Sequence, residues 1–129
     1  MKSKVLKDSD VKFSLKVVDN KYYLILLNQD VEFNVSDLQK LVDAEREIGG
    51  QKLPVLVICP PSATTNVDLL KELSKNKNNP YSVADGFVLS SIAQKIMANF
   101  YLKINKPERP TRFFNNEEQA KEWILQFPK

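Results

Sequence analysis

Residues 53–61 have the sequence Leu-Pro-Val-Leu-Val-Ile-Cys-Pro-Pro, an apolar run closed by two prolines. A continuous apolar run of this length is typical of a strand that is buried on both faces at the centre of a parallel sheet. Successive parallel strands require crossover connections, which are usually helices. The stretch therefore predicts an α/β fold, with helices and strands alternating on either side of it.

Two strands and a helix are expected before this central strand. Residues 11–18 alternate between apolar and polar side chains, and residues 21–27 form a second β-prone run. Asp19-Asn20 lies between them and tolerates positive φ, so the two strands should form a tight hairpin. Asn34 is then the expected N-cap of a helix that Gly49-Gly50 ends.

Three helices and two strands are expected after the central strand. In order, they are a helix opened by a Thr65–Asp68 capping box and ending near Lys75, a strand at 83–89, a helix opened by Ser91 and Gln94, a strand at 111–114 and a helix that begins at Asn115. The order β-β-α-β-α-β-α-β-α predicts a five-stranded mixed sheet with four helices, parallel except for one antiparallel strand. We expect one domain over residues 1–129, with residues 1–10 as a loosely ordered N-terminal segment.

The composition argues against a catalytic site. The chain contains no histidine, which excludes Ser-His-Asp and Cys-His triads, and its one cysteine, Cys59, cannot share a disulfide or a metal with a second cysteine. No glycine-rich phosphate loop and no metal-ligand spacing is present in the sequence. We therefore expect no enzyme activity, no metal and no cofactor.

Charge and hydropathy limit the partners and the cellular location that we expect for the chain. A net charge of +3 is too weak for a dedicated nucleic-acid-binding domain, so no nucleic-acid partner is expected. The apolar runs are far shorter than the about 20 residues of a membrane-spanning helix. The N-terminus has no apolar stretch of the kind found in a secretory signal. These observations predict a cytoplasmic protein without a membrane span.

The last third of the chain carries a family resemblance. It contains Ala84-Asp-Gly-Phe-Val-Leu-Ser-Ser-Ile-Ala-Gln94, then Ala98-Asn-Phe-Tyr-Leu-Lys-Ile-Asn-Lys-Pro-Glu-Arg-Pro-Thr-Arg-Phe-Phe114, followed by an acidic helix start and Trp123. This sequence resembles the uncharacterised bacterial SpoIIAA-like group of the STAS domain superfamily, which is related to the CRAL-TRIO lipid carriers. The resemblance implies a SpoIIAA-like (STAS) fold for most of the chain beyond Val11.

The resemblance implies a regulatory or ligand-binding role rather than a catalytic one. STAS modules act through partner proteins, and some of their relatives bind lipids or nucleotides. The first hypothesis is a non-enzymatic domain that acts through a protein partner or through self-association as a dimer. The alternative is a small carrier for a lipid or another apolar anion, with an apolar pocket and a basic mouth.

A phosphorylation site is a further implication of the resemblance. In anti-sigma-factor antagonists a kinase phosphorylates a serine or threonine just after the central strand, and Ser62, Thr64 and Thr65 occupy that place here. A phosphate at a helix N-terminus would face free N–H groups and the positive end of the helix dipole. The Asp-Ser-Ser-Gly type motif of that family is missing, however, and the alternative is that Thr65 is simply a helix cap.

Two further sets of residues are candidate binding sites. Four cations that could hold a phosphate or carboxylate lie within ten residues, although nearby glutamates could neutralise them: Lys103, Lys106, Arg109 and Arg112. Three residues could line a ligand pocket: Asp85, Phe87 and Tyr101. The alternative is that the aromatic side chains of this region fill the core and that Asp85 caps a turn or marks a bulge.

Overall fold

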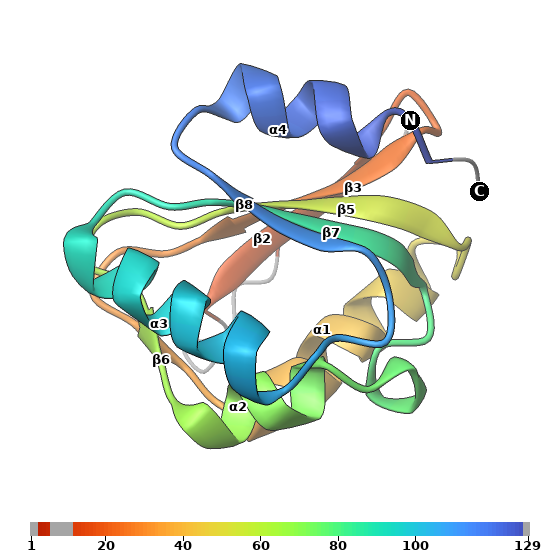
Figure 1. Ribbon diagram of the computed structural model, residues 1–129. Helices are drawn as coiled ribbons and strands as arrows, with labels where there is room; N and C mark the ends of the chain where they lie inside the picture. The colour runs from red at the N-terminus through yellow and green to blue at the C-terminus, as the bar shows by residue number, and fades with distance from the viewer. Residues whose placement is uncertain (1–2, 6–11, 128–129) are drawn as a thin grey trace.

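A mixed sheet forms the centre of the computed structural model, which describes residues 3–5 and 12–127 (Figure 1). The strands of this sheet are β1 (Ser3–Val5), β2 (Phe13–Val18), β3 (Tyr22–Leu27), β5 (Leu53–Ile58), β7 (Ser82–Val88) and β8 (Thr111–Phe114). They are arranged in the order β1-β2-β3-β5-β7-β8. The strands from β3 to β8 pair in parallel, whereas β2 is antiparallel to both β1 and β3. A separate short parallel pair joins β4 (Glu32–Phe33) to β6 (Thr64–Thr65).

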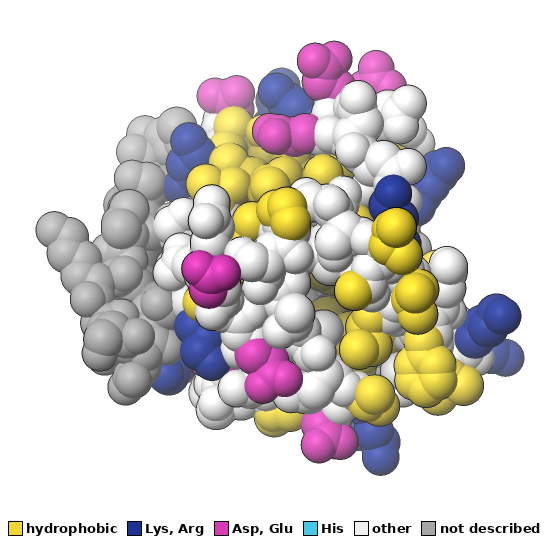
Figure 2. Space-filling view, turned by 90° about the vertical axis from the view of Figure 1, so that its left-hand side faces the viewer, with side chains coloured by type: hydrophobic (Ala, Val, Ile, Leu, Met, Phe, Trp, Pro, Cys, Tyr) yellow, Lys and Arg dark blue, Asp and Glu magenta, His cyan; other side chains and the backbone are white. Residues whose placement is uncertain are grey.

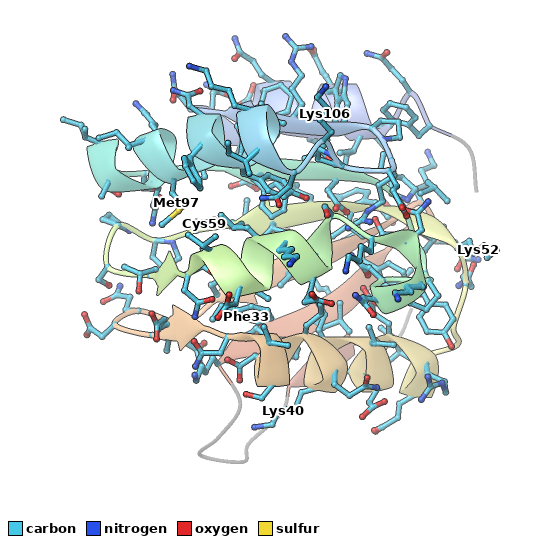
Figure 3. The ribbon with its side chains drawn as sticks, turned by 60° about the horizontal axis from the view of Figure 1, so that its bottom comes forward. Phe33, Lys40, Lys52, Cys59, Met97 and Lys106 are labelled. Atoms are coloured by element: carbon cyan, nitrogen blue, oxygen red, sulfur yellow. The ribbon has the colours of Figure 1, made fainter. Side chains whose placement is uncertain are left out.

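The helices cover the two faces of the sheet unequally. Three helices lie side by side on one face (Figures 1 and 3): α1 (Val35–Glu47), α2 (Val67–Leu73) and α3 (Ile92–Ile104). A single helix, α4 (Glu117–Ile124), covers the other face (Figure 1). A short 3₁₀ helix, η1 (Asn76–Asn78), lies between α2 and β7. None of the helices in the described part of the chain is long and apolar enough to cross a membrane.

The five expected strands and four expected helices are all present. The mixed sheet with one antiparallel hairpin strand is also confirmed, because β2 alone among the expected strands runs against its neighbour. The sixth strand was not expected: Ser3–Val5 lies in the segment that we expected to be loosely ordered, and it pairs with β2 at the sheet edge. Residues 1–2 and 6–10 of that segment lie outside the described residues.

Local backbone chemistry explains the hairpin and the ends of α1. Asp19 and Asn20 have positive φ angles of 50° and 60°, and the Lys21 N–H donates to the Val18 carbonyl at 2.8 Å, which closes the tight hairpin turn. At the start of α1 the Asn34 N–H donates to Asp37 Oδ2 at 2.7 Å, which forms part of the expected capping interaction. Gly49 and Gly50 both have positive φ and end the helix. The sequence predictions for these three features are confirmed.

Two predicted helix caps are wrong. The N-cap of α2 is Asn66, whose side chain accepts a 2.9 Å hydrogen bond from the Leu69 N–H, and not Thr65. Thr65 belongs instead to β6, and its hydroxyl donates to the Phe33 carbonyl at 2.7 Å. Pairing with β4 therefore removes Thr65 from the cap position. In the same way Asn116, one residue later than expected, caps α4.

Candidate ligand-binding cavity

A cavity of about 280 Å³ lies between the three-helix layer and the sheet. This volume is close to the lower end of the range of about 300–1,000 Å³ for small-molecule sites. Its walls are mostly apolar side chains from the sheet and from all three helices, among them Ile25, Val55, Val57, Leu41, Leu69, Leu70 and Met97. Figure 3 shows Phe33, Cys59 and Met97, which also line the cavity, between the helices of this layer.

The cavity reaches the surface at the carboxyl ends of the parallel strands. Pro61, Thr64 and Ala93 belong to its lining and are exposed, and they follow β5 or begin α3. Open α/β sheets bind their ligands at this end of the strands. Gln94 fixes the rim, because its side-chain amide donates to the carbonyls of Pro60 (2.7 Å) and Ala63 (2.9 Å). The first turn of α3 is thereby tied to the loop after β5.

Glu45 of α1 is a buried carboxyl group in the cavity wall. Its exposed fraction is 0%, and neither carboxyl oxygen has a hydrogen-bond partner among the described residues. Burial, together with the nearby charge of Asp85, raises its pKa to about 8 although Arg109 lowers it. A buried acceptor that lacks a partner is costly, so this side chain indicates a binding position inside the cavity.

The sequence analysis did not select Glu45, although a signal was present. Helical spacing places it on the same stripe as Leu38, Leu41 and Ile48, which are all buried. A charged residue on the core-facing stripe of a helix is rare unless it is paired or functional. That anomaly of spacing is sufficient to mark Glu45 as a candidate site residue.

A buried ion pair lies beside Glu45. Arg109 contacts Asp85 Oδ2 through Nε at 2.8 Å and through Nη2 at 2.6 Å. The Arg109 guanidinium also donates to the Leu73 carbonyl at 2.8 Å and to Asn76 Oδ1 at 3.2 Å. Asp85 accepts a further hydrogen bond from the Ser82 hydroxyl. The guanidinium is therefore occupied by partners from within the chain.

Two other residues of the cavity lining carry a buried polar atom without a partner among the described residues. Tyr101 is fully buried, and its hydroxyl oxygen has no hydrogen-bond partner in the part of the chain that the structure describes. Burial raises the pKa of this phenol, so it stays protonated. The Asn79 Oδ1 atom is likewise without a partner among residues 3–5 and 12–127. Together with Glu45, they are the cavity-lining residues of the described chain that carry an unpartnered buried polar atom.

The structure brings the three predicted pocket residues together. Asp85, Phe87 and Tyr101 all line the cavity. Phe87 stacks on Phe113 with ring centroids 5.1 Å apart, and Phe113 also contacts the edge of Tyr101. The alternative, that the aromatic side chains of this region fill the core, does not hold for Phe100 on α3, which is 43% exposed.

The predicted cluster of four cations is not formed. Arg109 is buried against Asp85, whereas Arg112 lies over the Phe114 ring, 5.2 Å from its centroid. Phe114 packs with Trp123 on the α4 side of the sheet, so Arg112 faces away from the cavity. Lys103 is exposed in the last turn of α3, and the exposed Lys106 lies at the same end of the helix, far from the cavity rim (Figure 3). Strand alternation and the inward turn of Arg109 thus separate residues that are close in sequence.

The predicted phospho-acceptors lie near the rim of the cavity. Ser62 is exposed, and its hydroxyl accepts a hydrogen bond from the Asp30 N–H at 2.8 Å. Thr64 is exposed and Thr65 is half-buried, and both line the cavity. None of the three caps α2, because Asn66 does so. Phosphorylation of Ser62, Thr64 or Thr65 stays a prediction.

Comparison with solved structures defines the class of fold. An uncharacterised protein of the DUF3478 family with a SpoIIAA-like fold, from Shewanella loihica PV-4, superposes with a TM-score of 0.55. The match covers 92% of this chain and 98% of that chain at 10% sequence identity, so it establishes the fold alone. The predicted SpoIIAA-like fold is confirmed.

The family of the chain follows from its sequence. The family model described as "Domain of unknown function (DUF7793)" matches residues 17–128, and the chain belongs to this family. No curated protein matches the chain.

Proposed function

We propose that the chain is a non-enzymatic, cytoplasmic binding domain that holds a small, mainly apolar ligand between its three-helix layer and its sheet. The observation that carries this proposal is the apolar cavity of about 280 Å³ with the carboxyl group of Glu45 in its wall, which has no hydrogen-bond partner among the described residues. Unfilled volume and an unpaired buried acceptor each destabilise a fold. A ligand that fills the space and bonds to Glu45 would offset both effects.

The nucleophiles and bases of the chain support binding rather than catalysis. The sequence contains no histidine, the commonest general base. Burial raises the pKa of the Cys59 thiol to about 12, so this side chain stays a thiol instead of a reactive thiolate. Cys59 therefore contributes apolar surface to the cavity.

The cavity supports the apolar pocket of the carrier hypothesis, but the basic residues expected at its mouth lie elsewhere. The exposed rim residues Pro61, Thr64 and Ala93 are uncharged. The buried Arg109 is paired with Asp85, and Lys106 lies at the other end of α3 (Figure 3). The proposed ligand is therefore mainly apolar and carries no negative charge.

Thermal unfolding in the presence of 1-octanol tests the proposal. A ligand that binds the folded chain but not the unfolded chain raises the melting temperature as the ligand concentration increases. We expect this for the wild type. Ala98→Leu places a larger side chain in the cavity wall and should abolish the shift. Asn99→Leu adds the same side chain at the exposed neighbouring position and serves as the control. An unchanged wild-type melting temperature at saturating octanol would contradict the proposal.

A second candidate function is partner binding through the outer face of α3. Four apolar side chains of this helix are solvent-exposed and are spaced four residues apart: Ile92 (76%), Ile96 (65%), Phe100 (43%) and Ile104 (61%). Figure 2 shows a stripe of hydrophobic side chains along one side of the molecule. Continuous exposed apolar surface is a common mark of an interaction site. This stripe supports a regulatory domain that acts through a protein partner or through a second copy of itself.

Sedimentation velocity tests the self-association form of this candidate. A concentration-dependent dimer that Ile96→Glu abolishes is the expected result, because the new charge would be desolvated at the interface. Lys95→Glu changes the charge on the polar side of the same helix and should leave the dimer in place. A wild-type monomer at all concentrations would reject self-association through α3.

A further inference from the structure

The unpartnered polar atoms of the cavity are mainly hydrogen-bond acceptors. Both carboxyl oxygens of Glu45 and the Oδ1 atom of Asn79 lack a partner among the described residues. The Tyr101 hydroxyl, also without one in that part of the chain, can both donate and accept, and so can the Glu45 carboxyl while it is protonated. Once Glu45 is ionised, a ligand that completes these bonds must bring donors.

The charges around the cavity oppose an anionic ligand. Arg109 is the cation that faces this region, but its guanidinium is occupied by Asp85 Oδ2 and the Leu73 carbonyl, each at 2.8 Å or less, and by Asn76 at 3.2 Å. No lysine or arginine of the described residues lines the cavity, so an anionic group there would meet the carboxyl groups of Glu45 and Asp85 without a free cation in return. A cationic group would meet Glu45, whose exposed fraction is 0%, with no competing partner.

We propose that the ligand is an apolar primary amine, and that its ammonium group binds the carboxylate of Glu45 while its apolar part fills the cavity. This inference rests on the proposed function, and it names the class of ligand that the cavity selects. An ammonium group supplies three donors and no acceptor, which suits the two carboxylate oxygens of Glu45. A charge-assisted bond to Glu45 is stronger than a neutral hydrogen bond in the same place.

The groups that face Glu45 give the proposal a pH dependence. They are Tyr23 from β3, Asp85 from β7 and Arg109 from the segment before β8. Burial is the largest cause that raises the pKa of Glu45 to about 8, so the empty site holds a protonated carboxyl at neutral pH. An ammonium ligand stabilises the carboxylate, and binding therefore releases the Glu45 proton to solvent. Affinity should rise about tenfold per pH unit between pH 6 and pH 7, and level off above pH 8.

Isothermal titration with three probes of equal chain length tests the proposal: n-octylamine, 1-octanol and octanoate. We expect the wild type to bind n-octylamine most tightly, 1-octanol more weakly and octanoate weakest of the three. Glu45→Gln keeps the shape of the side chain and should weaken n-octylamine binding at least about tenfold, with little effect on 1-octanol. Glu47→Gln removes the same charge from the exposed side of α1 and should leave all three affinities unchanged.

The outcomes separate this inference from the proposed function. Equal affinities for n-octylamine and 1-octanol, or an unchanged n-octylamine affinity in Glu45→Gln, would overturn the amine proposal and leave the cavity as a ligand site. Failure of the wild type to bind any of the three probes would overturn both. If Glu45→Gln does not fold, the pH dependence of the wild type decides: affinity for n-octylamine that is constant between pH 6 and pH 8 rejects the role of Glu45.

Discussion

The two faces of the sheet are packed in opposite ways. On the α4 face, a Cβ atom added to Gly86 would lie 2.8 Å from Cγ2 of Ile124, and both Ala120 and Ile124 are fully buried. On the other face the same strand presents Asp85 and Phe87 to a cavity of about 280 Å³. Strand β7 thus has a face without spare volume and a face that lines open space.

The buried polar groups follow the same division. Glu45, Asp85 and Asn79 line the cavity, and Arg109 is paired with one of them, whereas the buried cluster beneath α4 consists of Tyr22, Leu56, Val88, Ala120 and Ile124. Close apolar packing stabilises a fold, and unfilled volume with unpaired polar atoms destabilises it. We infer that the α4 face supports the fold and that the three-helix face is shaped for a ligand.

The largest effect should come from breaking the ion pair on the cavity face. Arg109→Ala leaves the carboxylate of Asp85 buried without its cation, which is expected to lower the free energy of unfolding by about 3–5 kcal/mol. Arg112→Ala, at an exposed position on the same segment, should change it by less than about 1 kcal/mol. Urea denaturation of both variants measures the difference. Equal losses of unfolding free energy in the two variants would show that the buried ion pair stabilises the fold no more than an exposed arginine does.

The pH dependence of stability should isolate Glu45. Its pKa is about 8 in the folded chain and has an ordinary value of 4.5, so the folded state keeps a proton that the unfolded state loses. This group therefore makes stability fall as pH rises from about 4.5 to about 8, by up to about 1.4 kcal/mol per pH unit.

Glu45→Gln removes that decline. The difference in unfolding free energy between this variant and the wild type should grow with pH up to about 8 and then stay constant. Denaturant titrations at several pH values test this, since the remaining carboxyl groups are common to both chains. A difference that does not vary with pH would mean that Glu45 is ionised in the folded state.

Gly86→Ala tests the close packing of the α4 face. The added methyl group meets Ile124 at 2.8 Å, so helix α4 or its side chains must shift. Overpacking of this kind costs about 1–3 kcal/mol, and we expect a loss of that size in chemical denaturation. Ile124→Leu in the same chain removes the Cγ2 methyl group from Cβ at equal side-chain size and should recover part of the loss. A wild-type stability for Gly86→Ala would contradict tight packing on this face.

The smallest effect is expected on the cavity face. Ala98→Leu adds volume next to open space, so its unfolding free energy should stay within about 1 kcal/mol of the wild type. Ala120→Leu makes the same change beneath α4, where Ala120 is fully buried, and should be clearly destabilising. Thermal or urea unfolding compares the two. Similar losses in both variants would indicate that the cavity face is as tightly packed as the α4 face.

The sequence predicted the architecture because the architecture depends on local patterns. The apolar run at residues 53–61, the turn at Asp19-Asn20 and the stop at Gly49-Gly50 each specify one element without distant contacts. The α2 cap was predicted at Thr65 because Thr65 and Asp68 match a capping-box pattern. The pairing of β4 with β6 removes Thr65 from the cap position, and it joins segments about thirty residues apart, which a local pattern does not show. Strand Ser3–Val5 lacked a pattern strong enough to be recognised.

The site was predicted in part. Asp85, Phe87 and Tyr101 were selected from their unusual or aromatic character, and they do line the cavity. Glu45 was placed on the same helical stripe as Leu41 and Ile48 but was not selected as a site residue, because helical spacing does not show whether a charged side chain on that stripe has a partner. The cluster of Lys103, Lys106, Arg109 and Arg112 was predicted from closeness in sequence, which does not determine the side of the sheet or the direction in which each side chain points.

Xenon binding tests the central contrast most directly. Apolar cavities of this size bind xenon, and a crystal of the wild-type chain pressurised with the gas should show it between α1, α2, α3 and the sheet, beside Val57, Leu69 and Met97. No xenon should bind between α4 and the sheet, where Ala120 and Ile124 are fully buried. Side chains closing the space beneath the three helices, with no xenon there, would contradict a ligand-binding cavity.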